Sequence, residues 1–369
     1  MTSAWEHSSP AQRIVFGAGA VSGVRELLRT LGARRAMLVT TSGRLASEQW
    51  PALERAIGGV LGTTFEEVEP HAPAPAVQAA AMQARRDGAD VVVSFGGGSC
   101  TDVAKAVCFF AEQEAGTPAV SWLDRPVLPH VAVPTTWSGA AFTTTFAVVD
   151  PGTRQPSAGG GSTTAPVAVV CDPDLTTSLP AGEAVGSALG ALAHCAEALW
   201  SPSRTPEAEA LARHGAALVW EGLGALVDDP ADGDAHTTLG SGAVLAGRAL
   251  QAGTAALHHG LVQLVGARSG VAHGLTHAVL LPHTLRLVAG TEPGAVAALR
   301  TAMGTTDDPA GGIAALAERA GLPDTLGTLG IDDDDVEAVV RLSQGHAEVQ
   351  AGPMPVSEDE VRGLLDAAR

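Results

Sequence analysis

Residues 90–106 read DVVVSFGGGSCTDVAKA and combine the features of a strand, a turn and a helix. The β-branched run at 90–94 predicts a buried strand, and residues 101–112 predict a helix. Between them, Gly97 and Gly98 carry no side chains, so their backbone N–H groups are open to a phosphate. Such a turn also occurs for packing alone, but in an open α/β sheet it is where nucleotides bind.

Two polar residues mark the start of the predicted helix. Ser99 is expected to cap it, and Asp102, three residues later, completes a pattern that is similar to a capping box. The helix N-terminus adds partial positive charge, which favours an anion such as pyrophosphate. We therefore expect Ser99 and Asp102 to belong to a cofactor site together with the two glycines.

A second polar turn follows the strand predicted at 127–133. It reads PTTWSGAAFTTTFAV over residues 134–148 and offers hydroxyls at Thr135, Thr136, Ser138 and Thr143. Alone this is an ordinary polar turn, but with the glycine turn it predicts a second wall of a cofactor site.

The strand predicted at 36–40 ends in Thr40, and two more small hydroxyl residues follow it. An acidic side chain at this place would accept hydrogen bonds from the adenosine ribose and favour NADH. None is present, so Thr40 is expected to contact a cofactor that is either NADH or NADPH.

The rest of the chain extends this pattern into two predicted domains. Strands alternate with helical segments over residues 1–178, which predicts a doubly wound, Rossmann-like parallel sheet. Its strands are expected at 13–19, 36–40, 63–68, 90–94, 127–133, 143–150 and 167–171, with a Gly/Ser/Thr-rich loop at 153–164. Residues 179–369 predict an all-helical domain, with helices at 183–200, 206–227, 236–265, 272–289, 293–302, 309–321, 333–347 and 357–368.

Composition excludes several classes of protein. The chain has 369 residues, is 46% hydrophobic and carries a net charge of −18, so it is expected to be globular and to bind neither nucleic acid nor anionic membranes. Its four cysteines form no CxxC pair, and residues 1–12 lack the pattern of a signal peptide, which together predict a cytoplasmic protein. Lys105 is the only lysine, and there is no tyrosine.

A second stretch carries the candidate chemistry. Residues 254–287 read TAALHHGLVQLVGARSGVAHGLTHAVLLPHTLRL and hold five of the twelve histidines. His259 and Gln263 are four residues apart, as are His273 and His277, so each pair lies on one helix face. A GARSG run between them predicts two helices that meet at a bend. With His194 of an earlier apolar helix, three imidazoles can converge, although a buried histidine is often only structural.

These motifs, in this order, resemble the iron-containing alcohol dehydrogenase superfamily and its dehydroquinate synthase-like architecture. The resemblance rests on GGGS–x4–AKA, PTT, DPxLTxxLP, AHCAEAL and HGLTHAVLLPH, and it is most detailed for the maleylacetate reductase branch. It implies a nucleotide-binding domain, a helical domain, a cleft between them and a homodimer. Metal-dependent members hold an ion with one Asp and three His, and His194, His259 and His273 match the histidines.

Gly190 stands where those members have the Asp. The maleylacetate reductases also lack that residue and are similar to this chain in working without metal, so no metal is expected to be required. Three histidines alone could still hold zinc with an open position, whereas loss of the charged oxygen ligand disfavours Fe²⁺.

The chain departs from the branch where a substrate is expected. Ala141, Gly260 and Gln263 replace a glutamate, a lysine and a histidine of the branch, and its lysine near the nicotinamide ribose has no counterpart. Arg268 is a candidate to grip a substrate carboxylate in their place. Gln263, Arg268 and His258 are therefore the predicted substrate-binding residues.

The resemblance implies a metal-independent, NAD(P)H-dependent reductase of a small conjugated keto acid, with maleylacetate reduced to 3-oxoadipate as the reference reaction. Hydride would reach the carbon β to the ketone, His259 and His273 would hydrogen-bond the ketone oxygen, and His194 would shape the pocket. One alternative is a carbonyl reductase or alcohol dehydrogenase of the family. Another is a non-redox enzyme or binding protein that kept the fold.

Overall fold

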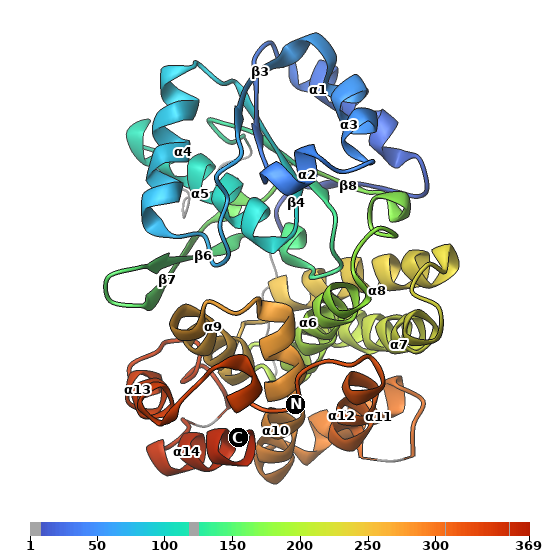
Figure 1. Cartoon of the computed structure of the whole chain (residues 1–369), viewed down its shortest axis with the longest axis vertical. Coiled ribbons are helices and arrows are strands. Elements are labelled where there is room, and N and C mark those ends of the chain that lie inside the picture. Colours follow the sequence, from blue (N-terminus) through green and yellow to red (C-terminus); the bar gives the residue numbers. More distant parts are fainter. Residues whose placement is uncertain (1–8, 118–124, 307, 354) are drawn as a thin grey trace. The chain divides into compact units, whose positions relative to one another are not determined.

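The chain divides into two compact units. A computed structural model describes residues 9–117, 125–306, 308–353 and 355–369 (Figure 1). The α/β unit comprises Ser9–Thr136 and Ala140–Ser178, and the helical unit comprises Leu179–Arg369 together with Trp137–Gly139. The short turn Trp137–Gly139 is therefore part of the helical unit, although the chain on both sides of it belongs to the α/β unit.

A parallel sheet forms the centre of the α/β unit, as the sequence predicts. Its six strands lie in the order β1 (Arg13–Phe16), β8 (Ala168–Cys171), β5 (His130–Pro134), β4 (Val91–Gly96), β2 (Ala36–Val39) and β3 (Leu61–Phe65). Every pairing between neighbours is parallel. The chain proceeds from β2 to β3 in one direction and from β4 to β5 in the other, so the order reverses between β2 and β4. The carboxyl ends of strands at such a reversal are where open α/β sheets bind ligands.

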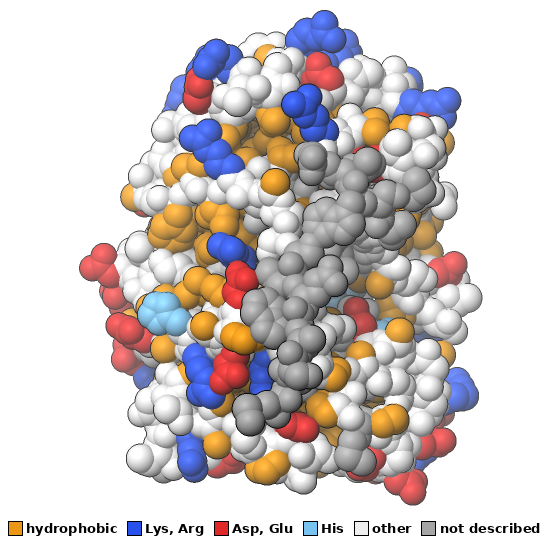
Figure 2. Space-filling view, turned by 180° about the vertical axis from the view of Figure 1, so that it is seen from behind, with side chains coloured by type: hydrophobic (Ala, Val, Ile, Leu, Met, Phe, Trp, Pro, Cys, Tyr) orange, Lys and Arg blue, Asp and Glu red, His pale blue; other side chains and the backbone are white. Residues whose placement is uncertain are grey.

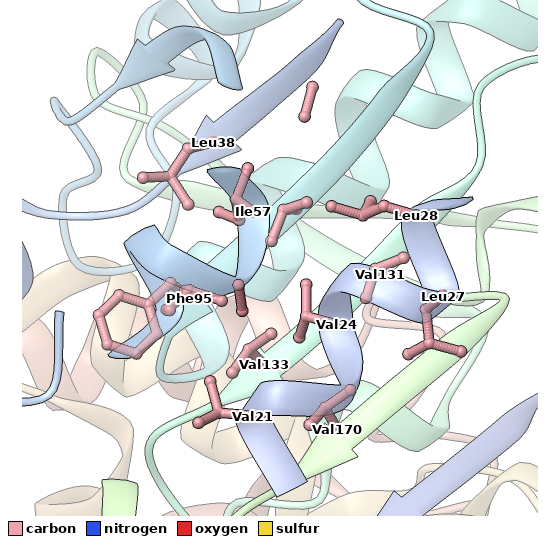
Figure 3. Packing of buried hydrophobic residues seen from close by; sticks show 14 of the residues in the cluster. Val21, Val24, Leu27, Leu28, Leu38, Ile57, Phe95, Val131, Val133 and Val170 are labelled. Atoms are coloured by element: carbon pink, nitrogen blue, oxygen red, sulfur yellow. The ribbon is translucent and has the colours of Figure 1, made fainter. Parts of the chain in front are cut away.

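Helices cover both faces of this sheet (Figure 1). One face packs against α1 (Val24–Leu31) and α3 (Trp50–Ile57), and the other against α4 (Ala74–Arg86) and α5 (Gly98–Glu114). Because side chains alternate along a strand, Val91, Val93 and Phe95 of β4 enter the first core, while Val92 enters the second. Figure 3 shows the first core, in which Val24 and Leu28 of α1 point toward Val131 and Val133 of β5. Burial on both faces explains why the central strands read as continuous apolar runs.

The structure corrects two predictions for this unit. The segment predicted as a strand at 143–150 is β6 (Thr145–Asp150), which lies outside the parallel sheet. It pairs antiparallel with β7 (Gln155–Gly160), inside the segment predicted as a loop. Small residues hide this strand in the sequence, since it is the pairing with β6 that makes QPSAGG extended.

The helical unit contains no strand among its described residues. Its helices are α6 (Ala181–Trp200), α7 (Pro206–Asp228), α8 (Gly233–Gln251), α9 (Leu257–Ser269), α10 (His273–Thr291), α11 (Pro293–Ala302), α12 (Pro309–Arg319), α13 (Asp333–Ser343) and α14 (Glu358–Ala367). The single helix predicted at 236–265 is wrong, because the chain breaks between α8 and α9. The predicted bend between two histidine-bearing helices is present, and α9 ends at Gly270, whose φ is 69°.

The surface shows how charge is distributed. On the described part of the face in Figure 2, basic side chains lie apart from one another among acidic and apolar ones. None of the described helices is both long enough and apolar enough to span a bilayer.

Candidate active site

A buried carboxylate organises the first turn of α9. Glu197, on the apolar helix α6, is fully buried. Its Oε1 accepts the backbone N–H groups of His258 at 2.7 Å and His259 at 3.1 Å, and its Oε2 accepts that of Ala256 at 3.0 Å. These are N–H groups that a helix start leaves without intrahelical partners, so Glu197 caps α9 from a neighbouring helix. A carboxylate this deeply buried is stable only when it is hydrogen-bonded in this way.

The same carboxylate holds the ring of His259. His259 Nδ1 lies 2.7 Å from Glu197 Oε2, and the His259 side chain is only 13% exposed. Burial by itself lowers the pKa of His259, but the charge of Glu197 and this hydrogen bond raise it above its ordinary value. Burial likewise opposes the charged form of Glu197, yet His259 brings the pKa of that carboxyl below its ordinary value. The two groups therefore form an ion pair, and His259 Nε2 has no hydrogen-bond partner among the described residues.

Further imidazoles form a cluster with His259. His194 of α6 stacks on it with ring centroids 4.6 Å apart, and His277 of α10 lies 5.1 Å from it. His273, the first residue of α10, lies 6.5 Å from His277. The structure thus places His194, His259 and His273, the predicted catalytic residues, in one cluster, with His277 between His259 and His273.

A chain of hydrogen bonds fixes the ring of His277. Thr284 donates its hydroxyl proton to Leu280 O at 3.0 Å, so it must accept a hydrogen bond from His258 Nδ1 at 3.1 Å. His258 Nε2 is then an acceptor for His277 Nδ1 at 2.8 Å. Burial lowers the pKa of His258 to about 3 and that of His277 well below its ordinary value, so both rings are neutral. The prediction that His258 binds substrate is wrong, because it is fully buried and both of its ring nitrogens are occupied.

The turn Trp137–Gly139 closes over His194. Trp137 donates its indole N–H to His236 Nδ1 at 3.4 Å, and its backbone N–H to Ser187 Oγ at 3.3 Å. Gly139 has a φ of +80°, and a Cβ there would lie 2.8 Å from His194 Nδ1. Only glycine fits this position. Ser138, predicted to line the cofactor site with Thr135 and Thr136, is half-buried and lies in this turn, which is part of the helical unit.

The cluster lacks the oxygen ligand that metal-dependent members of the resembled superfamily have. A Cβ at Gly190 would lie 3.1 Å from Cδ2 and 3.2 Å from Nε2 of His277, so a carboxylate side chain there would press on that ring. Among the described residues, no group of three or more His, Cys, Asp and Glu side chains is arranged to hold a metal ion. The charged oxygen ligand that an iron site needs is missing, and its place borders an imidazole.

The glycine turn lies at the reversal of strand order in the α/β unit. α5 begins at Gly98, and its N-cap is Gly97, without a side-chain cap. The predicted Ser99 cap is therefore wrong, and Ser99 lies inside the first turn. A Cβ at Gly97 would approach Thr136 Cγ2 to 3.2 Å, so the two polar turns are in contact. The N–H groups that this helix start leaves without intrahelical partners suit the pyrophosphate of a dinucleotide.

Lys105, roughly two turns further along α5, holds the second polar turn in shape. It is fully buried and donates to Ala140 O at 2.7 Å, to Thr145 O at 2.8 Å and to Thr143 Oγ1 at 2.9 Å. Burial lowers the pKa of Lys105 to about 8 and raises that of Asp102, its half-buried neighbour, to about 6. The sole lysine is therefore a structural group of this turn.

Two predicted cofactor contacts are corrected by their burial. The Thr143 hydroxyl accepts from Lys105, and Thr40 is fully buried with its hydroxyl donated to Phe95 O at 2.7 Å. Neither side chain is available to a ligand. Thr135 is also fully buried, and its backbone N–H donates to Gly96 O at 2.9 Å. Of the predicted cofactor residues, Gly97, Gly98, Ser99 and Thr136 are half-buried and lie at the turn.

The remaining predicted substrate residues are bound to acids. Gln263 Nε2 donates to Glu348 Oε2 at 2.7 Å. Arg268 Nε donates to Asp335 Oδ1 at 2.7 Å, and both side chains are 13% exposed. The prediction that Arg268 replaces the missing cations is wrong, since Asp335 neutralises it. Reasoning from sequence left Glu348 out altogether.

Glu197 and His277 are further residues of the site that the sequence predictions left out. The sequence could have indicated Glu197, because a carboxylate inside an apolar helix must have a buried partner. It could also have indicated His277, which is four residues from His273 and therefore lies on the same helix face.

Nearly the whole chain matches models of one protein family. A model described as iron-containing alcohol dehydrogenase matches residues 11–173, and one described as its C-terminal region matches residues 184–369. A maleylacetate reductase of Rhizobium sp. (strain MTP-10005) is 33% identical over 98% of this chain and 96% of its own length. The crystal structure of a putative alcohol dehydrogenase from Ralstonia eutropha JMP134 superposes with a TM-score of 0.88 at 31% identity, covering 100% of this chain and 98% of that one. A sulfoacetaldehyde reductase from Bifidobacterium kashiwanohense in complex with NAD+ shares the fold, with a TM-score of 0.84 at 23% identity over 99% and 98% of the two chains.

Proposed function

Since the chain belongs to the iron-containing alcohol dehydrogenase family, in its maleylacetate reductase branch, and is an oxidoreductase, we propose a finer assignment. In this proposal the protein is a metal-independent reductase that uses NADH or NADPH to reduce a small conjugated keto acid. The reduction of maleylacetate to 3-oxoadipate is the reference reaction, and the protein acts as a cytoplasmic homodimer. The observation that carries the proposal is the Glu197–His259 ion pair, in which the His259 Nε2 has no partner among the described residues and is a charged donor for an oxyanion.

The glycine turn is the proposed cofactor site. The backbone of Gly97 and Gly98 and the start of α5 would hold the pyrophosphate, with Ser99 and Thr136 beside it. When bound, the dinucleotide supplies the hydride for the carbon β to the ketone. The fold neighbour in complex with NAD+ supports this choice of cofactor.

The histidine cluster is the proposed catalytic site. As the β carbon gains a hydride, the π electrons of the alkene move toward the ketone, and negative charge develops on the ketone oxygen. His259 donates a hydrogen bond from Nε2 to that oxygen, and its own positive charge, held by Glu197, lowers the energy of the enolate. His273 is a second donor, and one of these histidines returns a proton to complete the α carbon. His194, stacked on His259, shapes the pocket.

Metal independence rests on the donor set. An imidazolium provides the positive charge that a metal ion provides in other members, and the place of the fourth ligand is Gly190 beside His277. No step of the proposed reaction passes through a metal.

When purified protein is mixed with maleylacetate and either NADH or NADPH, the absorbance of the reduced cofactor should fall at a rate that EDTA does not change. A rate that falls with EDTA and returns with added Zn²⁺ or Fe²⁺ would contradict metal independence. Oxidation of NADH by simple aldehydes or ketones but not by maleylacetate would favour a carbonyl reductase or alcohol dehydrogenase. Absence of cofactor binding in calorimetry would point to the non-redox alternative.

A further inference from the structure

The segment after α13 packs directly on α9 because α9 has a glycine at that point. A Cβ at Gly260 would lie 2.6 Å from Val349 Cγ2, 2.8 Å from Val349 N and 3.1 Å from His346 Nδ1. Any side chain at 260 would push the 346–349 segment away. The glycine thereby brings Glu348 to α9, one turn beyond His259.

Glu348 and Gln263 form one polar group on the His259 face of α9. Gln263 follows His259 by four residues and therefore lies on the same face of the helix. Its Nε2 donates to Glu348 Oε2 at 2.7 Å, which leaves Glu348 Oε1 and the Gln263 carbonyl oxygen as acceptors. Both side chains are half-buried. The polar atoms that remain for a ligand are the second N–H of Gln263, its carbonyl oxygen and Glu348 Oε1, so acceptors outnumber the donor and one of them belongs to an acid.

The charges around His259 are predominantly negative. Glu197 and Glu348 both act on His259, and both raise its pKa. Burial, together with Glu197, raises the pKa of Glu348 to about 7, against the opposing effects of His259 and Gln263. Arg268, the only arginine of α9, is held by Asp335. A second carboxylate on a substrate would meet like charge here without a free guanidinium on α9 to offset it.

We infer that Gln263 and Glu348 form a specificity-determining group, which selects carbonyl substrates that carry at most one carboxylate and present a neutral or hydrogen-bond-donating end to it. The inference rests on the proposed reductase function and narrows its substrate class. Maleylacetate, a dianion, is then a poor substrate compared with a mono-acid enone. Selection of this kind works by repulsion of the wrong ligand.

The test compares two substrates that share the conjugated ketone. Maleylacetate has two carboxylates, whereas 4-oxopent-2-enoate keeps the enone and only one. At about pH 8, where Glu348 is mostly ionised, the wild type should prefer the mono-acid in kcat/KM by about tenfold or more. Glu348→Gln keeps the shape and the hydrogen bond to Gln263 but removes the charge. It should reduce the preference by about fivefold or more, through a higher kcat/KM for maleylacetate.

Glu318→Gln is the matched control, since Glu318 is exposed on α12 and the same charge is removed there. Equal or better use of maleylacetate by the wild type, or an unchanged preference in Glu348→Gln, would overturn the inference. If neither compound is reduced with NADH or with NADPH, the proposed function is wrong. The inference is then decided by calorimetry with adipate and its monoamide. A gain in adipate affinity in Glu348→Gln alone supports it, and equal affinities in all three proteins overturn it.

Discussion

His259 donates its Nδ1–H to the fully buried carboxylate of Glu197 at 2.7 Å, and that carboxylate also caps the helix on which His259 lies. One acid thus fixes the position of the ring, leaves its Nε2 as the nitrogen without a partner among the described residues and favours the charged form of the imidazole. The capping of α9 and the charge of His259 therefore depend on the same group, because the backbone N–H groups that hold Glu197 also keep its charge next to the imidazole.

Replacement of Glu197 by Gln should move the pH dependence of the reaction. His259 has a raised pKa in the folded protein, so it is charged below that pKa and loses its charge as pH rises through it. Glu197→Gln removes the charge that raises the pKa, and the alkaline fall in kcat/KM should begin about one pH unit or more lower. Profiles of kcat/KM against pH and the ¹⁵N shifts of labelled histidine measure this. An unmoved profile in a folded variant would show that Glu197 is only structural.

Replacement of His259 by Ala should lower the rate without unfolding the protein. Loss of the Nε2 donor should reduce kcat by about tenfold or more, with a smaller change in KM, because the hydrogen bond strengthens as charge develops. His214→Ala, at an exposed position of α7, is the control. Equal rates in both variants would remove His259 from the mechanism.

Replacement of Gly139 by Ala should disturb the site through His194. The φ of +80° costs about 1 kcal/mol for a residue with a Cβ, and the contact of 2.8 Å with His194 Nδ1 adds to it. Gly304→Ala, with a φ of +63° and no atom within 4 Å of its Cβ, carries only the backbone cost. Urea denaturation should show a larger decrease in the free energy of unfolding for Gly139→Ala than for Gly304→Ala, and kcat should fall only in Gly139→Ala. Equal losses would mean that the turn adapts around the ring.

Replacement of Gly97 by Ala should weaken cofactor binding by roughly tenfold, because a methyl group obstructs the approach of a phosphate to the start of α5. The same methyl group would crowd Thr136 Cγ2 at 3.2 Å. The double variant Gly97→Ala/Thr136→Ser removes that crowding and should regain stability but not affinity for NADH or NADPH. Calorimetric titration distinguishes the two effects, and full recovery of affinity in the double variant would show that Gly97 has only a packing role.

The sequence predicted the parallel sheet and the glycine turn because both depend on local patterns. Buried strands such as β4 are continuous apolar runs, and glycines separate β4 from α5 in the chain itself. β7 could not be found this way, since its small residues become a strand only through β6. The predicted cap at Ser99 was wrong because Gly97 is the N-cap and α5 begins at Gly98, so the serine lies inside the first turn.

The histidine cluster was accessible from sequence because helical spacing places residues four apart on one face. Its partners were harder to find, since hydrogen bonds between distant segments leave no periodic signal. Glu348 is separated from Gln263 by α10 to α13, and only the close approach at Gly260 brings the two together. Arg268 shows the opposite error, because it was predicted to bind a substrate carboxylate but pairs with Asp335.

The burial of Lys105 has a practical consequence for work with this protein. It carries the only ε-amino group of the chain, and that group is enclosed by three oxygen acceptors. Amine-reactive dyes, lysine cross-linkers and lysine-based immobilisation will not reach a side chain of the folded protein. Their reaction at residue 105 would instead report that the second polar turn has opened.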